Sequence, residues 1–441
     1  MPRVQVIGAG LAGSEAAWQL AQRGIDVDLY EMRPIVSDPA HKSEWFGELV
    51  CSNSLRADNL ENAVGLLKEE LRRMDSLIMQ CADRNKVPAG GALAVDREAF
   101  AKEITEILCN HPRICVHREY VEKPQEEGIV VLATGPLTEG KMAEFIRSVT
   151  DDTDLYFYDA AAPIVTAESI DYNSAFWQSR YDKGDADYLN CPLTEEEYQA
   201  FYEALMAAQW VETKNFEKEI FFEGCMPIEV MAKRGYQTLV FGPMKPVGLK
   251  DPRKDENPFA VVQLRKDNQD GSLLNIVGFQ TRMRWGDQER VLRMIPALKN
   301  AEFVRLGVMH RNTFVNAPSN VMATTQLKKC ERILLAGQIS GVEGYVESTA
   351  SGLVAGINAY RMVTGQDAIA FPKECAIGGL LNYIQTANSK SFQPMNINFS
   401  LMPPLGYKVR DKKEKNGLIA KRALETLETF CAEKGLLWKN C

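Results

Sequence analysis

A glycine-rich turn near the start of the chain has the spacing needed to hold a dinucleotide. Its residues are Gly8, Ala9, Gly10, Leu11, Ala12 and Gly13, a G-x-G-x-x-G between an apolar stretch and a helical pattern. The first glycine permits a tight turn, the second lets a pyrophosphate approach the backbone, and the third lets the helix pack on the strand. Glu31, 18 residues after Gly13, is expected to hydrogen-bond a ribose 2′-hydroxyl.

Two further turns favour FAD over NAD as this dinucleotide. One follows an expected strand and consists of Ala133, Thr134 and Gly135. The other opens an expected helix and contains Gly337, Gln338, Gly341, Glu343, Gly344 and Tyr345. Their order resembles that of two-dinucleotide-fold flavoproteins, and glycines at a helix start offer backbone N–H groups to an anionic flavin ring. Glu343 and Tyr345 are expected either to shape or protonate the flavin site or to be structural.

The chain has ten cysteines without a Cys-x-x-Cys pair, and four histidines. This pattern indicates neither a zinc site nor a disulfide framework, so no metal ligand is predicted and most thiols are expected to be small buried apolar residues. Cys51 differs because Ser52, Asn53 and Ser54 follow it, just before a helical pattern. A helix N-terminus there would stabilise its thiolate.

The elements that must position these residues predict an α/β fold. The chain opens as strand, helix, strand, which is a βαβ unit. From about residue 151 the sequence consists of aromatic and β-branched stretches separated by turn residues. Near residue 333 a strand followed by a helix, like the pair that opens the chain, is expected again. We therefore expect a discontinuous Rossmann-type FAD-binding domain (1–150 and 326–441) with an inserted α+β domain (151–325). The expected helices span 11–23, 60–83, 97–110, 194–209 and 348–364, and the expected strands 4–8, 27–30, 114–116, 130–132 and 333–336.

Length and charge bound the function classes. A chain of 441 residues suggests two domains. It contains no apolar run long enough for a membrane helix and no expected signal peptide, so a cytoplasmic protein is expected. The net charge of −8 argues weakly against a nucleic-acid partner, but residues 265–311 and 408–422 carry balances of +4 and +5. These stretches are either solvated faces or an RNA-binding surface.

Several blocks together resemble the folate- and FAD-dependent tRNA uracil-5-methyltransferases, the TrmFO family. The resemblance runs from about residue 3 to about residue 399, and some blocks are shared with the related glucose-inhibited division flavoproteins. The blocks that carry it are Gly8–Gly13, Leu49–Leu55, Gly90–Arg97, Phe222–Glu229, Gly278–Thr281, 336–347 and Asn396–Phe399.

This resemblance implies a reaction and its partners. The family takes a carbon from 5,10-methylenetetrahydrofolate, passes it through reduced FAD to C5 of a uridine in the T-loop of tRNA, and uses NADH or NADPH as reductant. By family correspondence Cys225 is the thiol that adds to uracil C6, which turns C5 into a nucleophile. Cys51 is assigned to the flavin side, as a proton-transfer partner or as a thiol that traps the flavin-bound carbon.

Other interpretations stay open at this stage. Methylation of ribosomal RNA shares almost every motif with methylation of tRNA. An FAD-dependent oxidoreductase of a small molecule would not need the basic stretches, and an RNA-binding flavoprotein with a structural FAD would need neither Cys51 nor Cys225. With one Rossmann opening and no second fingerprint, the nicotinamide reductant is expected to dock over the flavin ring. Residues 392–399 form either a wall for the pterin or a loop packed on the core.

Overall fold

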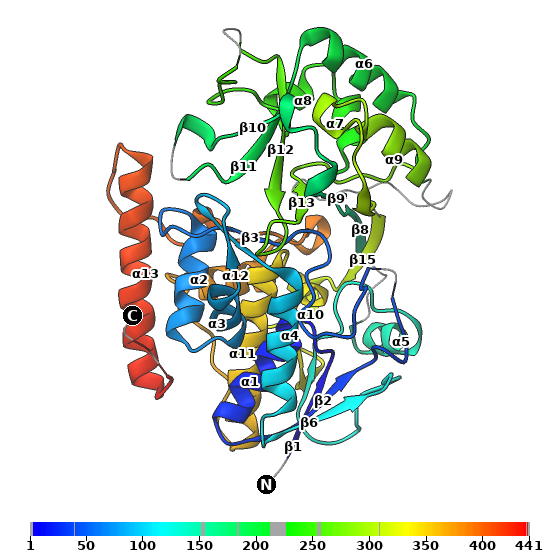
Figure 1. The fold of residues 1–441 in the computed structure, drawn as a ribbon. Coiled ribbons are helices and arrows are strands. Elements are labelled where there is room, and N and C mark those ends of the chain that lie inside the picture. Colours follow the sequence, from blue (N-terminus) through cyan, green and yellow to red (C-terminus); the bar gives the residue numbers. More distant parts are fainter. Residues whose placement is uncertain are drawn as a thin grey trace.

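A six-stranded sheet forms the centre of the part of the molecule that contains both chain ends (Figure 1). The computed structural model describes residues 3–38, 40–150, 155–182, 185–211, 226–253, 257–307, 309–437 and 439. The sheet has the order β16-β17-β7-β1-β2-β6 and is parallel except for the β16–β17 pair. Its strands are β1 (Arg3–Ile7), β2 (Asp26–Glu31), β6 (Ile114–Arg118), β7 (Val130–Leu132), β16 (Gln326–Leu327) and β17 (Cys330–Leu335).

Helices α1 and α11 pack against each other beside this sheet. Each follows one of the glycine-containing turns predicted to bind the dinucleotide, so their packing fixes the positions of these two turns. Gly352 and Gly356 of α11 permit the close approach. A Cβ on Gly352 would lie 2.2 Å from Ala12 O, and a Cβ on Gly356 would lie 2.7 Å from Ala16 O. The helices of this part are α1 (Leu11–Gln22), α2 (Ala63–Arg73), α3 (Leu77–Arg84), α4 (Arg97–Cys109), α5 (Gly140–Thr150), α10 (Ala317–Asn320), α11 (Tyr345–Val363), α12 (Ala376–Thr386) and α13 (Lys412–Lys434). Helix α13, in red, runs along one side of the molecule (Figure 1).

A second six-stranded sheet, drawn in green above the first (Figure 1), is built from the middle of the chain. Its order is β10-β11-β12-β13-β9-β14 and its pairs are antiparallel. Its strands are β9 (Ile164–Thr166), β10 (Phe176–Trp177), β11 (Tyr188–Leu193), β12 (Ala260–Lys266), β13 (Leu273–Ile276) and β14 (Phe303–Arg305). The helices on it are α6 (Glu195–Met206), α7 (Ile228–Lys233), α8 (Thr238–Phe241) and α9 (Trp285–Leu292).

Two smaller groups of strands complete the structure. Strands β8 (Leu155–Ala160) and β15 (Met309–Phe314) pair antiparallel where the chain enters and leaves the middle region. Strands β3 (Ser54–Ala57), β4 (Lys86–Val87) and β5 (Ala92–Val95) form a three-stranded sheet.

The buried apolar side chains form two large cores. One draws its residues from 4–146 and 314–431, and the other from 165–301. We propose that these cores correspond to the two domains expected from the sequence, with boundaries near residues 150 and 326. Within the described residues, no helix combines the length and the apolarity needed to cross a membrane.

The α/β fold with a Rossmann opening is confirmed, but several predicted helix boundaries are wrong. The single helix expected over 60–83 is two helices, because Asp75 has a φ of 61° and Ser76 caps α3 by accepting a hydrogen bond from Met79 N. Helix α11 begins at Tyr345 rather than at Ser348. Gly344, with a φ of 108°, makes the turn that starts it.

Candidate flavin and thiol site

The glycine turn after β1 is closed against the protein and open on one side. A Cβ on Gly8 would lie 2.3 Å from Ala133 O, and one on Gly13 would lie 1.7 Å from Gly8 O. A Cβ on Gly10 would meet no atom within 4 Å. No side chain caps α1, so the backbone N–H groups of its first turn face that open side. An uncapped helix start beside an open glycine fits the pyrophosphate of a dinucleotide.

Glu31 lies at the end of β2 beside this turn, as the motif requires. Its carboxylate accepts hydrogen bonds from Ala9 N at 3.1 Å and from Arg33 Nε at 2.9 Å. Burial would raise the pKa of Glu31, but the hydrogen bonds and charge of Arg33 outweigh it and hold the pKa below its usual value. The group is therefore a carboxylate at neutral pH, and its two oxygens can accept more bonds than these.

The two other predicted cofactor turns lie next to the glycine turn. Ala133 touches it directly, as the space around Gly8 shows, and Gly135 has a φ of 78° with open space beside its Cα. A Cβ on Gly337 would lie 3.1 Å from Ala12 Cβ. Three of the turns predicted to bind FAD thus converge at the carboxyl end of the parallel strands, where open α/β sheets bind ligands. Of the residues predicted there, Leu11 and Ala12 lie in the first turn of α1, and Thr134 accepts a hydrogen bond from Thr138 Oγ1.

The turn before α11 is held by side chains of its own and of the 392–399 segment. Gln338 Nε2 donates to Glu343 Oε2 at 2.5 Å, and Asn396 Nδ2 donates to Glu343 O at 2.6 Å. Gly341 lies against Phe392, because a Cβ there would be 2.8 Å from the ring. Phe392 is itself buried. The 392–399 segment is therefore packed on this turn, which is one of the two alternatives left open by the sequence.

Cys51 and Tyr345 are brought together from positions 294 residues apart. The Tyr345 hydroxyl accepts hydrogen bonds from Cys51 N at 2.8 Å and from Ser52 N at 3.3 Å, and it lies 2.9 Å from Cys51 Sγ. Burial and then the nearby charge of Cys51 raise the pKa of Tyr345 well above its usual value. The phenol therefore keeps its proton. Since its oxygen already accepts two N–H groups, that proton is directed to the sulfur.

The expectation that a helix begins directly after the Cys51 loop is wrong. Residues Ser54–Ala57 form strand β3, and the next helix, α2, begins at Ala63. The short polar run Ser52–Ser54 precedes an edge of a small sheet because β3 pairs with β5. The helix start that does approach Cys51 is that of α11, through Tyr345, its first residue.

Cys225 lies outside the described residues, but the last residues of its motif block, 226–229, are described. Ile228 N donates to Gln280 O at 2.8 Å. Glu229 is fully buried, and its carboxylate accepts bonds from Thr281 Oγ1 at 2.9 Å and from Arg282 N at 2.8 Å. Burial raises the pKa of Glu229. The described end of this block, Ile228 and Glu229, thus meets the Gly278–Thr281 block in the inserted region.

The first of the two basic stretches is only partly a surface. Arg265 and Arg282 are 5% and 3% exposed, so the expectation that Arg282 forms part of an exposed basic face is wrong. Arg282 lies over the Trp210 ring and near Glu229.

The second basic stretch is an exposed surface. Lys408, Arg410, Lys412, Lys413, Lys415 and Lys421 are exposed around the start of α13. Arg410, Lys412 and Lys415 line a surface cavity of about 550 Å³. This stretch offers a polyanion several cations that it can reach.

Three arginines around Cys51 were not predicted as site residues from the sequence. Arg97 lies at the start of α4, Arg265 in β12 and Arg305 at the end of β14, and all three bond the 49–53 segment. No spacing pattern could have joined residues so far apart. Their only signals were that Arg97 ends a family-like block and that the other two lie in a basic stretch.

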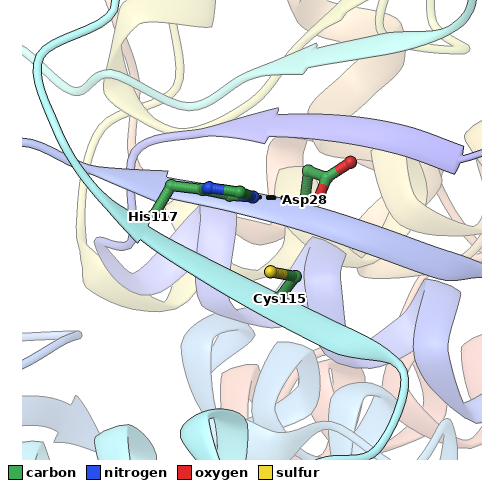
Figure 2. Close-up of side chains that lie close together, drawn as sticks. All are labelled: Asp28, Cys115 and His117. Atoms are coloured by element: carbon green, nitrogen blue, oxygen red, sulfur yellow. Dashed lines mark hydrogen bonds and ion pairs between the residues drawn. The ribbon is translucent and has the colours of Figure 1, made fainter.

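Asp28, Cys115 and His117 form the group among the described residues whose donor atoms could hold a metal ion (Figure 2). They share one face of β2 and β6 because Asp28 pairs with Cys115 in the sheet. Asp28 Oδ1 already accepts from Arg3 at 2.7 Å and lies 2.9 Å from His117 Nε2. The His117 ring stacks on Tyr30. An ion-paired surface network accounts for this group, and we assign it no function.

Comparisons with known proteins give the family. A model of the family described as "Glucose inhibited division protein A" matches residues 3–367. The methylenetetrahydrofolate–tRNA-(uracil-5-)-methyltransferase TrmFO of Desulfitobacterium hafniense is 59% identical over 99% of this chain and 100% of its own. The protein of the same name from Heliobacterium modesticaldum is 60% identical over 98% of both chains.

Solved structures agree in fold. Aquifex aeolicus GidA superposes with a TM-score of 0.71 at 17% identity, over 99% of this chain and 74% of that one. With this fold, a matching family model and near-full-length relatives, the chain belongs to the glucose inhibited division protein A family and, within it, to the TrmFO methyltransferases.

Proposed function

We infer that this chain is a methylenetetrahydrofolate- and FAD-dependent tRNA (uracil-5-)-methyltransferase that acts in the cytoplasm on a T-loop uridine, with NADH or NADPH as reductant. The observation that carries the inference is the identity of 59% over the whole length of a relative with that name. The site supports it independently, because a dinucleotide cradle and a partly buried thiol with a phenol beside it are adjacent in the structure.

The chain's own groups account for binding of the cofactor. The N–H groups at the start of α1 would bind the pyrophosphate, and Gly10 leaves the backbone open to it. The Glu31 carboxylate would accept a hydrogen bond from a ribose hydroxyl, and the turn from Gly337 to Tyr345 would hold the flavin ring. When bound, FAD supplies the hydride and one-carbon transfer chemistry that amino-acid side chains lack.

Cys225 activates the uracil. Its thiolate adds to C6, forming an S–C6 bond, and the electron pair of the C5–C6 double bond moves to C5. C5 then attacks the one-carbon electrophile. After a base removes the C5 proton, the electron pair of that C–H bond re-forms the C5–C6 double bond and expels the Cys225 thiolate. The carbon on C5 would then become the methyl group with a hydride that reduced FAD would supply, the bond to its carrier would break, and NADH or NADPH would be the source of the two electrons.

Cys51 acts on the flavin side of the reaction. Its sulfur accepts a hydrogen bond from the Tyr345 hydroxyl, and such a bond favours the thiolate over the neutral thiol. A thiolate there can take up a proton when the reaction releases one and return it later. The contact of Cys51 with Tyr345, the first residue of α11, puts the thiol beside the turn that we assign to the flavin.

Trapping with 5-fluorouridine tests this function. RNA that carries 5-fluorouridine at the target position should form a covalent complex with the holoenzyme, because fluorine cannot leave from C5 as the proton does. Cys225→Ala should lose both this complex and 5-methyluridine formation, and it should keep FAD that NAD(P)H still reduces. Cys109→Ala, which removes an exposed thiol at the end of α4, is the matched control and should keep both. Near-normal methylation by Cys225→Ala would refute the role of this residue.

A further inference from the structure

Two guanidinium groups hold the backbone on the near side of Cys51. Arg97 Nη1 donates to Leu49 O at 2.9 Å, and Arg305 Nη2 donates to Val50 O at 2.6 Å. Arg97 belongs to α4 and Arg305 to β14, so the two groups approach the segment from different proposed domains. The loop that carries Cys51 is therefore fixed where the two cores meet.

A third guanidinium group holds the far side of the segment. Arg265 Nη2 donates to Asn53 Oδ1 at 2.6 Å and to Ser52 Oγ at 3.2 Å. Asn53 is buried, and its Nδ2 donates to Val95 O and Lys266 O, each at 3.0 Å. The segment is thus bound on both sides of the thiol, and Cys51 has little freedom to move.

Among the described residues, Arg97 is ion-paired with Asp267, whereas Arg265 and Arg305 have no carboxylate within ion-pairing distance. Burial, followed by the charge of Arg97, lowers the pKa of Arg305, so the two guanidinium groups feel each other. Attraction to the ionised forms of Tyr345, Glu48 and Cys51 acts in the opposite direction and raises the pKa of Arg305. One buried nitrogen each of Arg97, Arg265 and Arg305 has no hydrogen-bond partner among the described residues.

The acidic groups nearby are already engaged. Asp267 pairs with Arg97 Nε at 3.0 Å. Glu48 accepts bonds from Ser43 and lies 3.3 Å from Arg33 Nη1.

On the other side of Cys51, Glu347 of α11 pairs with Arg56. Arg305 has no carboxylate within ion-pairing distance among the described residues, and its guanidinium bonds Val50 O, the residue before Cys51, so its charge lies beside the loop that carries the sulfur.

We propose that Arg305, supported by Arg97, is a positioning residue that keeps the Cys51 side chain anionic and holds its loop across the junction of the two domains. A nearby cation favours the charged form of a thiol, and burial of the pair weakens screening by water. The proposal rests on the proposed function in one respect only, because that function gives the Cys51 thiolate its role in the reaction. Its test needs no RNA and no folate, so it can fail while the proposed function stands.

The test is the pH dependence of alkylation in the flavin-bound protein. The holoenzyme is treated with iodoacetamide from about pH 5 to about pH 10, and modification of each cysteine is followed by peptide mass spectrometry. Cys115 is exposed and serves as a reference in the same sample. The midpoint for wild-type Cys51 should lie below that for Cys115. A Cys51 midpoint at or above that of Cys115 would overturn the proposal, whatever happens to the variants.

Variants of Arg305 separate charge from packing. Arg305→Met should shift the Cys51 midpoint upward and slow its alkylation at neutral pH about tenfold, and Arg305→Lys should recover most of that rate because it restores the charge. Arg293→Met is the matched control, since Arg293 pairs with Glu289 in the same proposed domain, and it should keep the wild-type midpoint. An unchanged Cys51 midpoint in an Arg305→Met protein that retains FAD would overturn the proposal.

Discussion

The Tyr345 hydroxyl accepts the backbone N–H groups of Cys51 and Ser52 and directs its own proton to the Cys51 sulfur, 2.9 Å away. This relationship joins the start of α11, which belongs to the proposed flavin site, to the thiol proposed to work beside it. Tyr345 therefore fixes both the place of Cys51 and the acceptor role of its sulfur.

Tyr345→Phe should weaken catalysis more than it weakens cofactor binding. The variant removes the hydrogen bond to the sulfur and the acceptor of Cys51 N and Ser52 N. The bond to a charged sulfur alone is worth about 1.5–3 kcal/mol, which corresponds to a loss of roughly ten- to a hundredfold in methylation rate. FAD content, measured by absorbance after denaturation, should stay stoichiometric because the backbone glycines of the turn are unchanged. Methylation at the wild-type rate would show that the phenol only fills space.

Gly10→Leu should give a folded apoprotein. A Cβ at residue 10 meets no protein atom within 4 Å, so a leucine side chain starts into open space and should exclude the pyrophosphate without disturbing the fold. Gly13→Leu is the contrasting variant, since its Cβ would lie 1.7 Å from Gly8 O and should destabilise the βαβ unit itself. Circular dichroism and flavin content distinguish the two. Stoichiometric FAD in Gly10→Leu would contradict the assignment of this turn.

Replacing Lys412 and Lys413 together by Ala should weaken tRNA binding. Both side chains are exposed at the start of α13, and each phosphate that they no longer neutralise should flatten the plot of log K against log salt by about 0.7–0.9. The control is Lys123→Ala with Lys141→Ala, a pair of exposed lysines away from α13. If affinity and salt slope are the same in both double variants, the RNA surface lies elsewhere.

Glu70 should make the protein less stable as the pH rises from about 4.5 to about 8. Burial raises the pKa of this α2 side chain to about 8, although it accepts Ala376 N and Ile377 N at the start of α12. The folded state therefore holds a proton that the unfolded state has lost in this range, so the free energy of unfolding falls with increasing pH. Glu70→Gln carries no titrating proton and should show a smaller fall in melting temperature. Parallel pH profiles for the two proteins would refute this.

The cofactor cradle could be predicted from the sequence because its signals are local. The glycine spacing, the alternation of β1 and the acid at position 31 all lie within one βαβ unit. The break at Asp75 could not be predicted, since the helical pattern runs through it and only the left-handed backbone of that residue ends α2. Arg282 looked like a surface cation because burial depends on Trp210 and Glu229, which are distant in sequence.

The surroundings of Cys51 could be predicted only as far as the next few residues. Its short polar loop suggested a following helix, but the groups that hold it come from Arg97, Arg305 and Tyr345. Long-range contacts of this kind leave no periodic trace in the chain. The family resemblance predicts a role for this thiol, and the structure shows the residues around it.

The most direct measurement of the central claim is the transfer of a labelled carbon. The purified holoenzyme is incubated with ¹³C-labelled methylenetetrahydrofolate, NADH or NADPH, and unmodified tRNA, with ribosomal RNA in a parallel reaction, and the digested nucleosides are analysed by mass spectrometry. Cys225→Ala and a reaction without the nicotinamide serve as controls. We predict ¹³C-labelled 5-methyluridine from the T-loop of tRNA and none from either control. Label in ribosomal RNA alone, or nicotinamide oxidation without labelled nucleoside, would contradict the account.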